Sequence, residues 1–392
     1  MDGNGGTGLQ FGVFDHIEHL PGVPLAQLYV ERLQQLEALD EAGFHCYFVA
    51  EHHTPAIHAM APSQNVFLAA ASQRTKRLHL GPGVYVLPLY HPLRLIEEIS
   101  MLDNLTKGRL ELGVGRGGVL EAFFWGQSHD DDENRAHFEE TLAILHEGLS
   151  HDVLTYEGRF VSFDEVPMRL RPVQQPHPPF WYMRNSTTSA QRGMNCLFTG
   201  TLDQVEANVM RYRKVWAERW GEGAPNAQGR QPWVGASIFL VMAETDEEAR
   251  RIGEPAYEAF SWNLGTPRRL EAERRQLGKL FNAPSGHARL TELAESHVPE
   301  EEMGLIEERL GDLSESEREE RALRRQHNGV RPLYVSPASM RAYLDEYLTT
   351  GANYLCLSFQ FGDLSHEQAM RSIELFVQEV MPHYQGAPPA AW

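Results

Sequence analysis

Apolar runs alternate with amphipathic stretches along most of this chain. Residues 9–14 form a short apolar run, and residues 25–42 then carry apolar side chains at helical spacing, Leu25, Tyr29, Leu33, Leu36 and Leu39, before Gly43. Such a run predicts a strand, and the spaced positions predict a helix that the glycine ends.

The same alternation repeats further along. Strand-like apolar runs lie at residues 46–50, 78–87, 110–114, 180–183, 196–198, 237–241 and 354–359, and helical patterns lie at 61–72, 92–104 and 136–149. Continuous apolar strands separated by helices indicate a parallel sheet. Eight such units predict an α/β fold of the (β/α)8 TIM-barrel type, and an open doubly wound sheet is the structural alternative.

Two helices near the end of the chain are the best specified. The first has one apolar face and ends at Gly351; the face consists of Met340, Tyr343, Leu344, Tyr347 and Leu348. Ser365 and Gln368 then form a capping box ahead of a helix that Pro382 stops.

The pattern also suggests how the chain is divided. We expect a disordered tail at residues 1–8, one barrel over residues 9–385 and a short tail at 386–392. Residues 265–330 are dense in Glu and Arg and break the rhythm, so they predict an insertion in the barrel. It is either a solvated helical excursion on the rim or a mobile active-site lid.

Composition excludes several classes of partner. The formal net charge of -19 would repel phosphate backbones and anionic headgroups, so we expect no nucleic acid and no membrane partner. The first ten residues lack a signal-peptide pattern, and no later run approaches the roughly 20 apolar residues of a membrane helix, which predicts a cytoplasmic protein. Three widely spaced cysteines predict reduced core residues and no metal cluster.

Glu51, His52 and His53 are the first candidates for chemistry. They follow a predicted barrel strand directly, and the loops at the carboxyl ends of barrel strands converge on one open face. An imidazole there exchanges protons near neutral pH, and the carboxylate of Glu51 can tune it, so this motif is a candidate for catalysis. On residue type alone, a histidine-rich loop with ordinary hydrogen bonds is the better interpretation, and the position after a strand shifts the balance towards function.

A metal site at the same place is disfavoured. His52, His53 and His58 lie close in sequence, but neighbouring residues at a strand end point to opposite sides. We therefore predict no metal ligands here, and His53 is expected to face away as a structural residue.

Two further strand ends suggest anion sites. Gly115 and Arg116 stand in a glycine-rich turn, where the backbone can approach a ligand and the guanidinium can bind phosphate. Asn185, Ser186, Thr187 and Thr188 lead into a short helix predicted at residues 189–193, and their hydroxyls and the free N–H groups of its start would also bind an anion. Simpler interpretations are an ion pair for Arg116 and a helix cap for the second run.

Several motifs together resemble a known family. They are AEHH at residues 50–53, VLPLYHP at 86–92, LDNLTKGRLELGVGRG at 102–117, PPFWYMRNSTT at 178–188 and SFQFGDLSHEQAMRSIELFVQEVMP at 358–382. With these motifs the chain resembles the bacterial luciferase-like, flavin-dependent monooxygenases. The block at residues 102–117 is the most specific of them.

The resemblance implies a TIM barrel that binds reduced FMN, lets it react with O2 to a hydroperoxyflavin and transfers one oxygen atom to a small organic substrate. It assigns the catalytic histidine to His52, which we expect Glu51 to orient, and the phosphate-binding arginine to Arg116, with residues 185–188 as a second phosphate site. It also aligns Gly83 and Val84 with a non-proline cis peptide beneath the flavin ring.

The resemblance has limits. Gly115 and Val119 replace the cysteine and tyrosine found near the flavin in luciferases, so we expect no useful bioluminescence. We expect Phe14, Tyr85 and Val119 to line the substrate pocket, with Phe123, Phe124 and Trp125 as further apolar wall.

Partners and alternatives follow from the same resemblance. A separate flavin reductase is expected to supply FMNH2, and self-association as a homodimer is common in the family. One alternative is a barrel that binds a deazaflavin and transfers hydride without oxygen. Another is a barrel that binds flavin or a partner without catalysis. The sequence names no substrate and does not separate hydroxylation from Baeyer-Villiger oxidation.

Overall fold

The chain forms one barrel in the computed structural model, which describes residues 9–53, 59–117, 125–126, 130–183, 185–280 and 332–384, with side chains omitted at 265–280. The barrel strands are β1 (Gln10–Asp15), β2 (Cys46–Val49), β3 (His79–Pro82), β4 (Tyr85–Val86), β5 (Leu112–Gly115), β8 (Phe180–Met183), β9 (Asn195–Phe198), β10 (Val234–Met242) and β12 (Tyr354–Ser358). Their order is β3-β2-β1-β12-β10-β9-β8-β5-β4, and every pair is parallel.

The first and last strands in this order, β3 and β4, are consecutive segments that together make one strand of the barrel. A parallel bridge between Leu80 and Leu110 joins this combined strand to the segment leading into β5. Counting β3 and β4 as one, the nine parallel segments make the eight strands of a nearly closed barrel. The (β/α)8 prediction is confirmed, and the open sheet is excluded.

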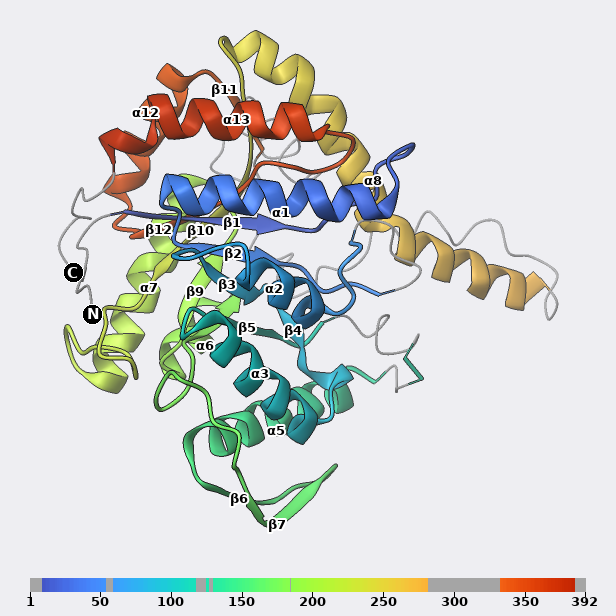
Figure 1. Ribbon diagram of the computed structural model, residues 1–392, viewed down its shortest axis with the longest axis vertical. Helices are drawn as coiled ribbons and strands as arrows, with labels where there is room; N and C mark the ends of the chain where they lie inside the picture. Colours follow the sequence, from blue (N-terminus) through green and yellow to red (C-terminus); the bar gives the residue numbers. More distant parts are fainter. Residues whose placement is uncertain are drawn as a thin grey trace, which may run out of the picture.

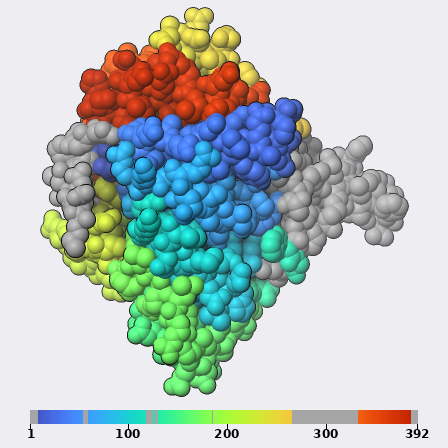
Figure 2. Space-filling view, viewed as in Figure 1, coloured from blue at the N-terminus to red at the C-terminus, as the bar shows by residue number. Residues whose placement is uncertain are grey.

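Strand β1 holds the two ends of the fold together. It pairs with β2 on one side and with β12 on the other, with Gln10 opposite Tyr354. In Figures 1 and 2 the first helix, in blue, consequently lies beside the last helices, in red.

Helices follow most of the strands, at the places that the hydrophobic pattern predicted and at others, such as α7 and α8, that it did not. They are α1 (Leu25–Ala42), α2 (Gln64–Ser72), α3 (Pro92–Thr106), α5 (Asp131–Ser150), α6 (Ser186–Gln191), α7 (Leu202–Trp220), α8 (Asp246–Leu280), α12 (Pro337–Thr349) and α13 (His366–Glu379), with 3-10 turns η1 (Leu87–Leu89) and η2 (Met381–His383). The predicted limits of α1 are confirmed, since it ends at Gly43 with φ 86°, a left-handed conformation suited to glycine. The capping box of α13 is also confirmed, with Ser365 and Gln368 each bonding the other's backbone N–H.

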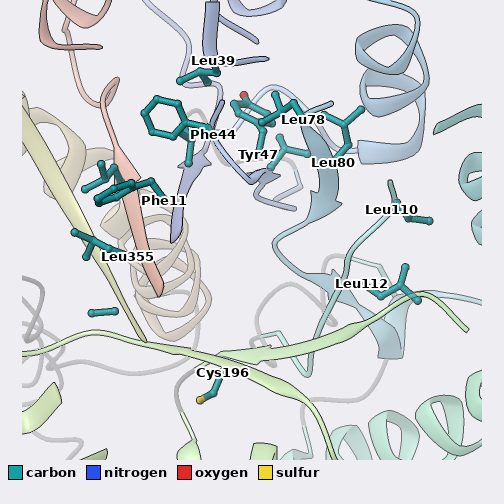
Figure 3. Packing of buried hydrophobic residues seen from close by; sticks show 14 of the residues in the cluster. Phe11, Leu39, Phe44, Tyr47, Leu78, Leu80, Leu110, Leu112, Cys196 and Leu355 are labelled. Carbon is teal, nitrogen blue, oxygen red and sulfur yellow. The ribbon is translucent and has the colours of Figure 1, made fainter. Parts of the chain in front are cut away.

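Two apolar layers hold the barrel. The larger one fills the space between the strands and the surrounding helices, as Figure 3 shows for Phe11, Phe44 and Leu355. A second cluster lies among inward-facing side chains, chiefly Phe48, Trp181, Leu197, Tyr354 and Cys356, with Phe14 against it. The three cysteines are free and buried, as the sequence predicted.

Several elements were not expected. Strands β6 (Val153–Glu157) and β7 (Ser162–Pro167) form an antiparallel hairpin, drawn at the bottom of Figure 1. A short strand, β11 (Leu333–Val335), pairs with β10. Helix α8 continues as far as Leu280, so the predicted insertion begins as a helix. Residues 281–331 lie outside the described residues, and the lid prediction falls largely on them. Among the described residues, none of the helices is long and apolar enough to cross a membrane.

Candidate active site

The candidate residues gather where the parallel strands end. Glu51, His52 and His53 follow β2, and Gly115 and Arg116 lie at the end of β5. Residues 185–188 follow β8 at the same end of the barrel. The carboxyl ends of the strands of such a barrel form its functional face.

Glu51 is buried and is held from three sides. Its Oε1 lies 2.8 Å from Nε2 of His53, and its Oε2 accepts bonds from the Val86 backbone N–H at 3.0 Å and the Tyr90 hydroxyl at 2.9 Å. Burial and then the charge of Glu51 raise the pKa of Tyr90, which keeps its phenol protonated as a donor. We expected Glu51 to orient His52, whereas both of its oxygens are engaged by other groups and the histidine it holds is His53.

His52 is half-buried and faces a third histidine. Its ring is nearly parallel to that of His16, with centroids 5.8 Å apart and an interplanar angle of 16°. His16 follows β1 and also contacts Phe14 and Phe260 edge-on or tilted. The sequence analysis missed His16, although its place directly after a strand is the signal that singled out His52.

Two buried carboxylates flank this region. Asp15, the last residue of β1, pairs with Arg32 of α1 at 2.7 Å and accepts from the Tyr47 hydroxyl at 2.6 Å. Glu18 accepts from the backbone N–H of Gly362 and from Asn263 of α8. Neither carboxylate was singled out from the sequence, because a single acidic residue near a strand end carries no motif.

The environment of Glu18 strongly favours its neutral form. Burial, aided by the nearby charge of Asp15, raises its pKa from 4.5 to about 8 against the lowering effect of its hydrogen bonds. Glu18 is therefore mostly protonated at neutral pH and joins the β1 end, α8 and the loop after β12 as an uncharged group.

Arg116 is half-exposed and already has an anionic partner. Its Nη1 lies 2.5 Å from Oδ1 of Asp131, in the first turn of α5, and this bond lowers the pKa of Asp131. The ion pair is the simpler of the two interpretations drawn from the sequence. It also shows that the guanidinium reaches an anion at this rim.

Residues 185–188 form a helix cap. The Asn185 side chain accepts from the Thr188 backbone N–H at 2.9 Å, and the Ser186 hydroxyl donates to Asn208 of α7 at 2.9 Å. Ser186 is buried, whereas Thr187 and Thr188 are half-buried. Asn185 is exposed but its side chain is used in the cap, so the two threonine hydroxyls are the remaining accessible donors of the predicted anion site.

Close packing surrounds the Gly83 to Val84 peptide. This peptide is cis, as the family resemblance implied. A Cβ added at Gly83 would lie 2.9 Å from the Phe14 ring, and one added at Gly115 would lie 2.4 Å from Val84. Glycine at both positions lets the strand ends and the Phe14 ring come together.

The residues expected to line the substrate pocket lie in different parts of the structure. Phe14 packs against the inward-facing cluster and is partly exposed. Tyr85 is fully buried in the layer beneath the helices, where its hydroxyl donates to Asn65 of α2, so we remove it from the pocket. Trp125 contacts His53 edge-on, and Val119, Phe123, Phe124 and His58 lie outside the described residues.

Comparison with known proteins identifies the family to which this chain is similar. Residues 9–332 match the family model described as luciferase-like monooxygenase. An uncharacterized protein, y4wF, of Sinorhizobium fredii is 38% identical over 65% of this chain and 74% of its own. Limonene 1,2-monooxygenase of Rhodococcus erythropolis is 30% identical over 56% of each chain, so the match spans little more than half of that relative.

Solved structures share the fold. The oxygenating constituent of 3,6-diketocamphane monooxygenase from Pseudomonas putida, in complex with FMN, superposes with a TM-score of 0.68 at 18% identity, covering 96% of this chain and 99% of the other. Coenzyme F420-dependent tetrahydromethanopterin reductase from Methanopyrus kandleri superposes with a TM-score of 0.61 at 16% identity and the same coverage. At these identities the likeness shows the barrel alone.

Proposed function

The chain belongs to the luciferase-like monooxygenase family, and from this premise we propose that it is the oxygenase of a two-component system. In this proposal it uses reduced FMN from a separate reductase, together with O2, to insert one oxygen atom into a small organic substrate. Named relatives support the monooxygenase activity, and the FMN complex of the diketocamphane enzyme supports the flavin.

The observation that carries the proposal is the gathering of two kinds of group at one barrel end. Titratable side chains, His16, His52 and the Glu51 to His53 pair, share that end with the Arg116 guanidinium. Proton exchange and phosphate binding are the two tasks that a flavin oxygenase requires of its protein.

The residues present fit a flavin phosphate in charge and access. Arg116 keeps 32% of its side chain exposed, and its partner Asp131 keeps 53%. An exposed ion pair of this kind contributes about 0 to 1 kcal/mol, so a phosphate dianion can replace the carboxylate. Thr187 and Thr188 would supply further hydroxyl donors from the start of α6.

The chain's residues then have distinct tasks. Reduced FMN supplies the electrons for O2 activation when it is bound. Arg116 would hold its phosphate, and Gly83, Val84 and Gly115 are the backbone positions that would receive the flavin. An imidazole nitrogen of His52 holds or releases the proton needed near the substrate, while Glu51 fixes the neighbouring His53. The Phe14 ring excludes water from that side.

Anaerobic titration with reduced FMN tests the cofactor assignment. Loss of a charge-assisted bond to phosphate costs about 1.5 to 3 kcal/mol, so Arg116→Ala should weaken binding about 10- to 150-fold. Arg192→Ala is the matched control, because Arg192 is similarly exposed and pairs with Glu139 at 2.6 Å. Equal affinity of the Arg116 variant and the wild type would remove Arg116 from the proposal.

A deazaflavin is the second candidate cofactor, because the F420-dependent reductase shares the barrel. In that case the protein would transfer hydride without consuming O2. Parallel titrations with reduced FMN and reduced deazaflavin separate the two, and O2 uptake during turnover identifies the monooxygenase. Binding of either cofactor without turnover over a broad substrate panel would instead indicate a non-catalytic barrel.

A further inference from the structure

Three potential metal ligands meet at the end of the barrel opposite the candidate active site. His45 directly precedes β2, His79 begins β3, and Glu111 directly precedes β5. Their ligand atoms all lie within 4.8 Å of one another, and in the part of the chain that the structure describes they are the group of this kind that could hold an ion. The three residues come from strand starts that are neighbours in the ring.

The separations within this group suit a shared ion. Nδ1 of His79 lies 2.9 Å from Oε1 of Glu111. Two ligands bound at about 2.0 to 2.2 Å in a tetrahedral shell lie about 3.3 to 3.6 Å apart, so these two atoms need to separate by about half an ångström to share an ion. The His45 ring stacks on His79 with centroids 4.8 Å apart, and its ligand atom lies within 4.8 Å of those of His79 and Glu111.

Neighbouring side chains hold the ligands in place. The Trp181 indole donates to Oε2 of Glu111 at 2.6 Å, which leaves Oε1 directed at His79. The Tyr354 hydroxyl lies 3.1 Å from Nδ1 of His45. Such outer contacts, which fix the orientation of an imidazole or a carboxylate, are usual around protein-bound metals.

Ligand chemistry and access also favour a cation. Glu111 supplies a carboxylate oxygen beside the two imidazoles. His45 and His79 are half-buried and therefore reachable from the amino end of the barrel.

We propose that His45, His79 and Glu111 form a binding site for a divalent transition-metal ion, with Zn²⁺ the best match to two imidazoles and one carboxylate. The ion ties the starts of β2, β3 and β5 together. The site is independent of the flavin reaction, since it lies at the other end of the strands.

Metal uptake by the full chain tests the site. Chelator-treated protein is dialysed against Zn²⁺ alone, and the bound metal is counted by mass spectrometry. We expect one equivalent in the wild type and at least tenfold weaker binding in Glu111→Gln, whose amide oxygen can still accept from Trp181. His151→Asn is the matched control, because His151 and Glu147 form an exposed pair at 3.0 Å, and it should bind as the wild type does.

A second measurement needs no variant. Zn²⁺ should protect His45 and His79 of the wild type from diethyl pyrocarbonate, while exposed His151 stays reactive. Absence of a bound equivalent, uptake unchanged in Glu111→Gln, or labelling of His45 and His79 that ignores Zn²⁺ would each overturn the proposal.

Discussion

Glu18 should make the stability of this barrel fall as the pH rises. Its pKa is 4.5 when solvated and about 8 in the folded state, so between these values the folded chain binds more protons than the unfolded chain. The favourable contribution is complete below pH 4.5 and is lost as the pH rises through 8. Each pH unit in that window changes the free energy of unfolding by about 1.4 kcal/mol, which gives as much as about 5 kcal/mol in total.

Replacing Glu18 by Gln isolates this effect. The amide has a similar shape, can still accept from the Gly362 backbone N–H and does not ionise. The variant should therefore gain about 3 to 5 kcal/mol relative to the wild type between pH 5 and pH 9, because only the wild type must bury a charge or take up a proton.

Urea unfolding of both proteins at the two pH values measures the gain. All other titrating groups are common to the pair, so the quantity to compare is the difference between the variant and the wild type. Glu254→Gln, at an exposed position of α8, is the surface control. An equal difference at pH 5 and pH 9 for the Glu18 variant would refute the reasoning.

Three other substitutions test separate features. His52→Ala should lower the oxygenation rate about 100-fold or more, as loss of a general acid-base group does, and an unchanged kcat in a reduced-FMN and O2 assay would exclude that role. Arg32→Met should cost about 3 to 5 kcal/mol in urea unfolding, because it leaves the Asp15 carboxylate buried without its cation; a loss below about 1 kcal/mol would contradict this. Gly362→Ala should destabilise by more than about 2 kcal/mol, since its Cβ would lie 1.8 Å from a backbone oxygen of α8. Gly126→Ala, with a similar positive φ but open space around it, should cost clearly less, and equal thermal shifts for the two would rule out the clash.

The barrel strands could be predicted from the sequence because they are buried. Barrel strands are covered on both faces, so they appear in the sequence as continuous apolar runs. The β6 to β7 hairpin is largely exposed, and its burial pattern carries no such run. Helix α7 was also missed, since its long polar face conceals the four buried positions Val205, Val209, Tyr212 and Trp216.

The position of the candidate site could be predicted from the sequence, but the hydrogen-bond partners of Glu51 could not. Position after a strand brought Glu51, His52 and His53 to the correct end of the barrel. The alternation that separates His52 from His53 also puts Glu51 and His53 on the same side, and that consequence was not drawn. The Glu51 bonds to Val86 and Tyr90 join separate parts of the chain, which no local pattern indicates.

The position of β1 has a consequence for synthesis. One hydrogen-bonding edge of β1 is covered only by β12, which leaves the ribosome about 340 residues later. At about 5 to 20 residues per second, that edge waits roughly 20 to 70 s for its partner. An uncovered strand edge is a template for joining another chain. Newly made chains should therefore depend on chaperones until the last strand emerges, and a ribosome stalled before Tyr354 should release an aggregating product.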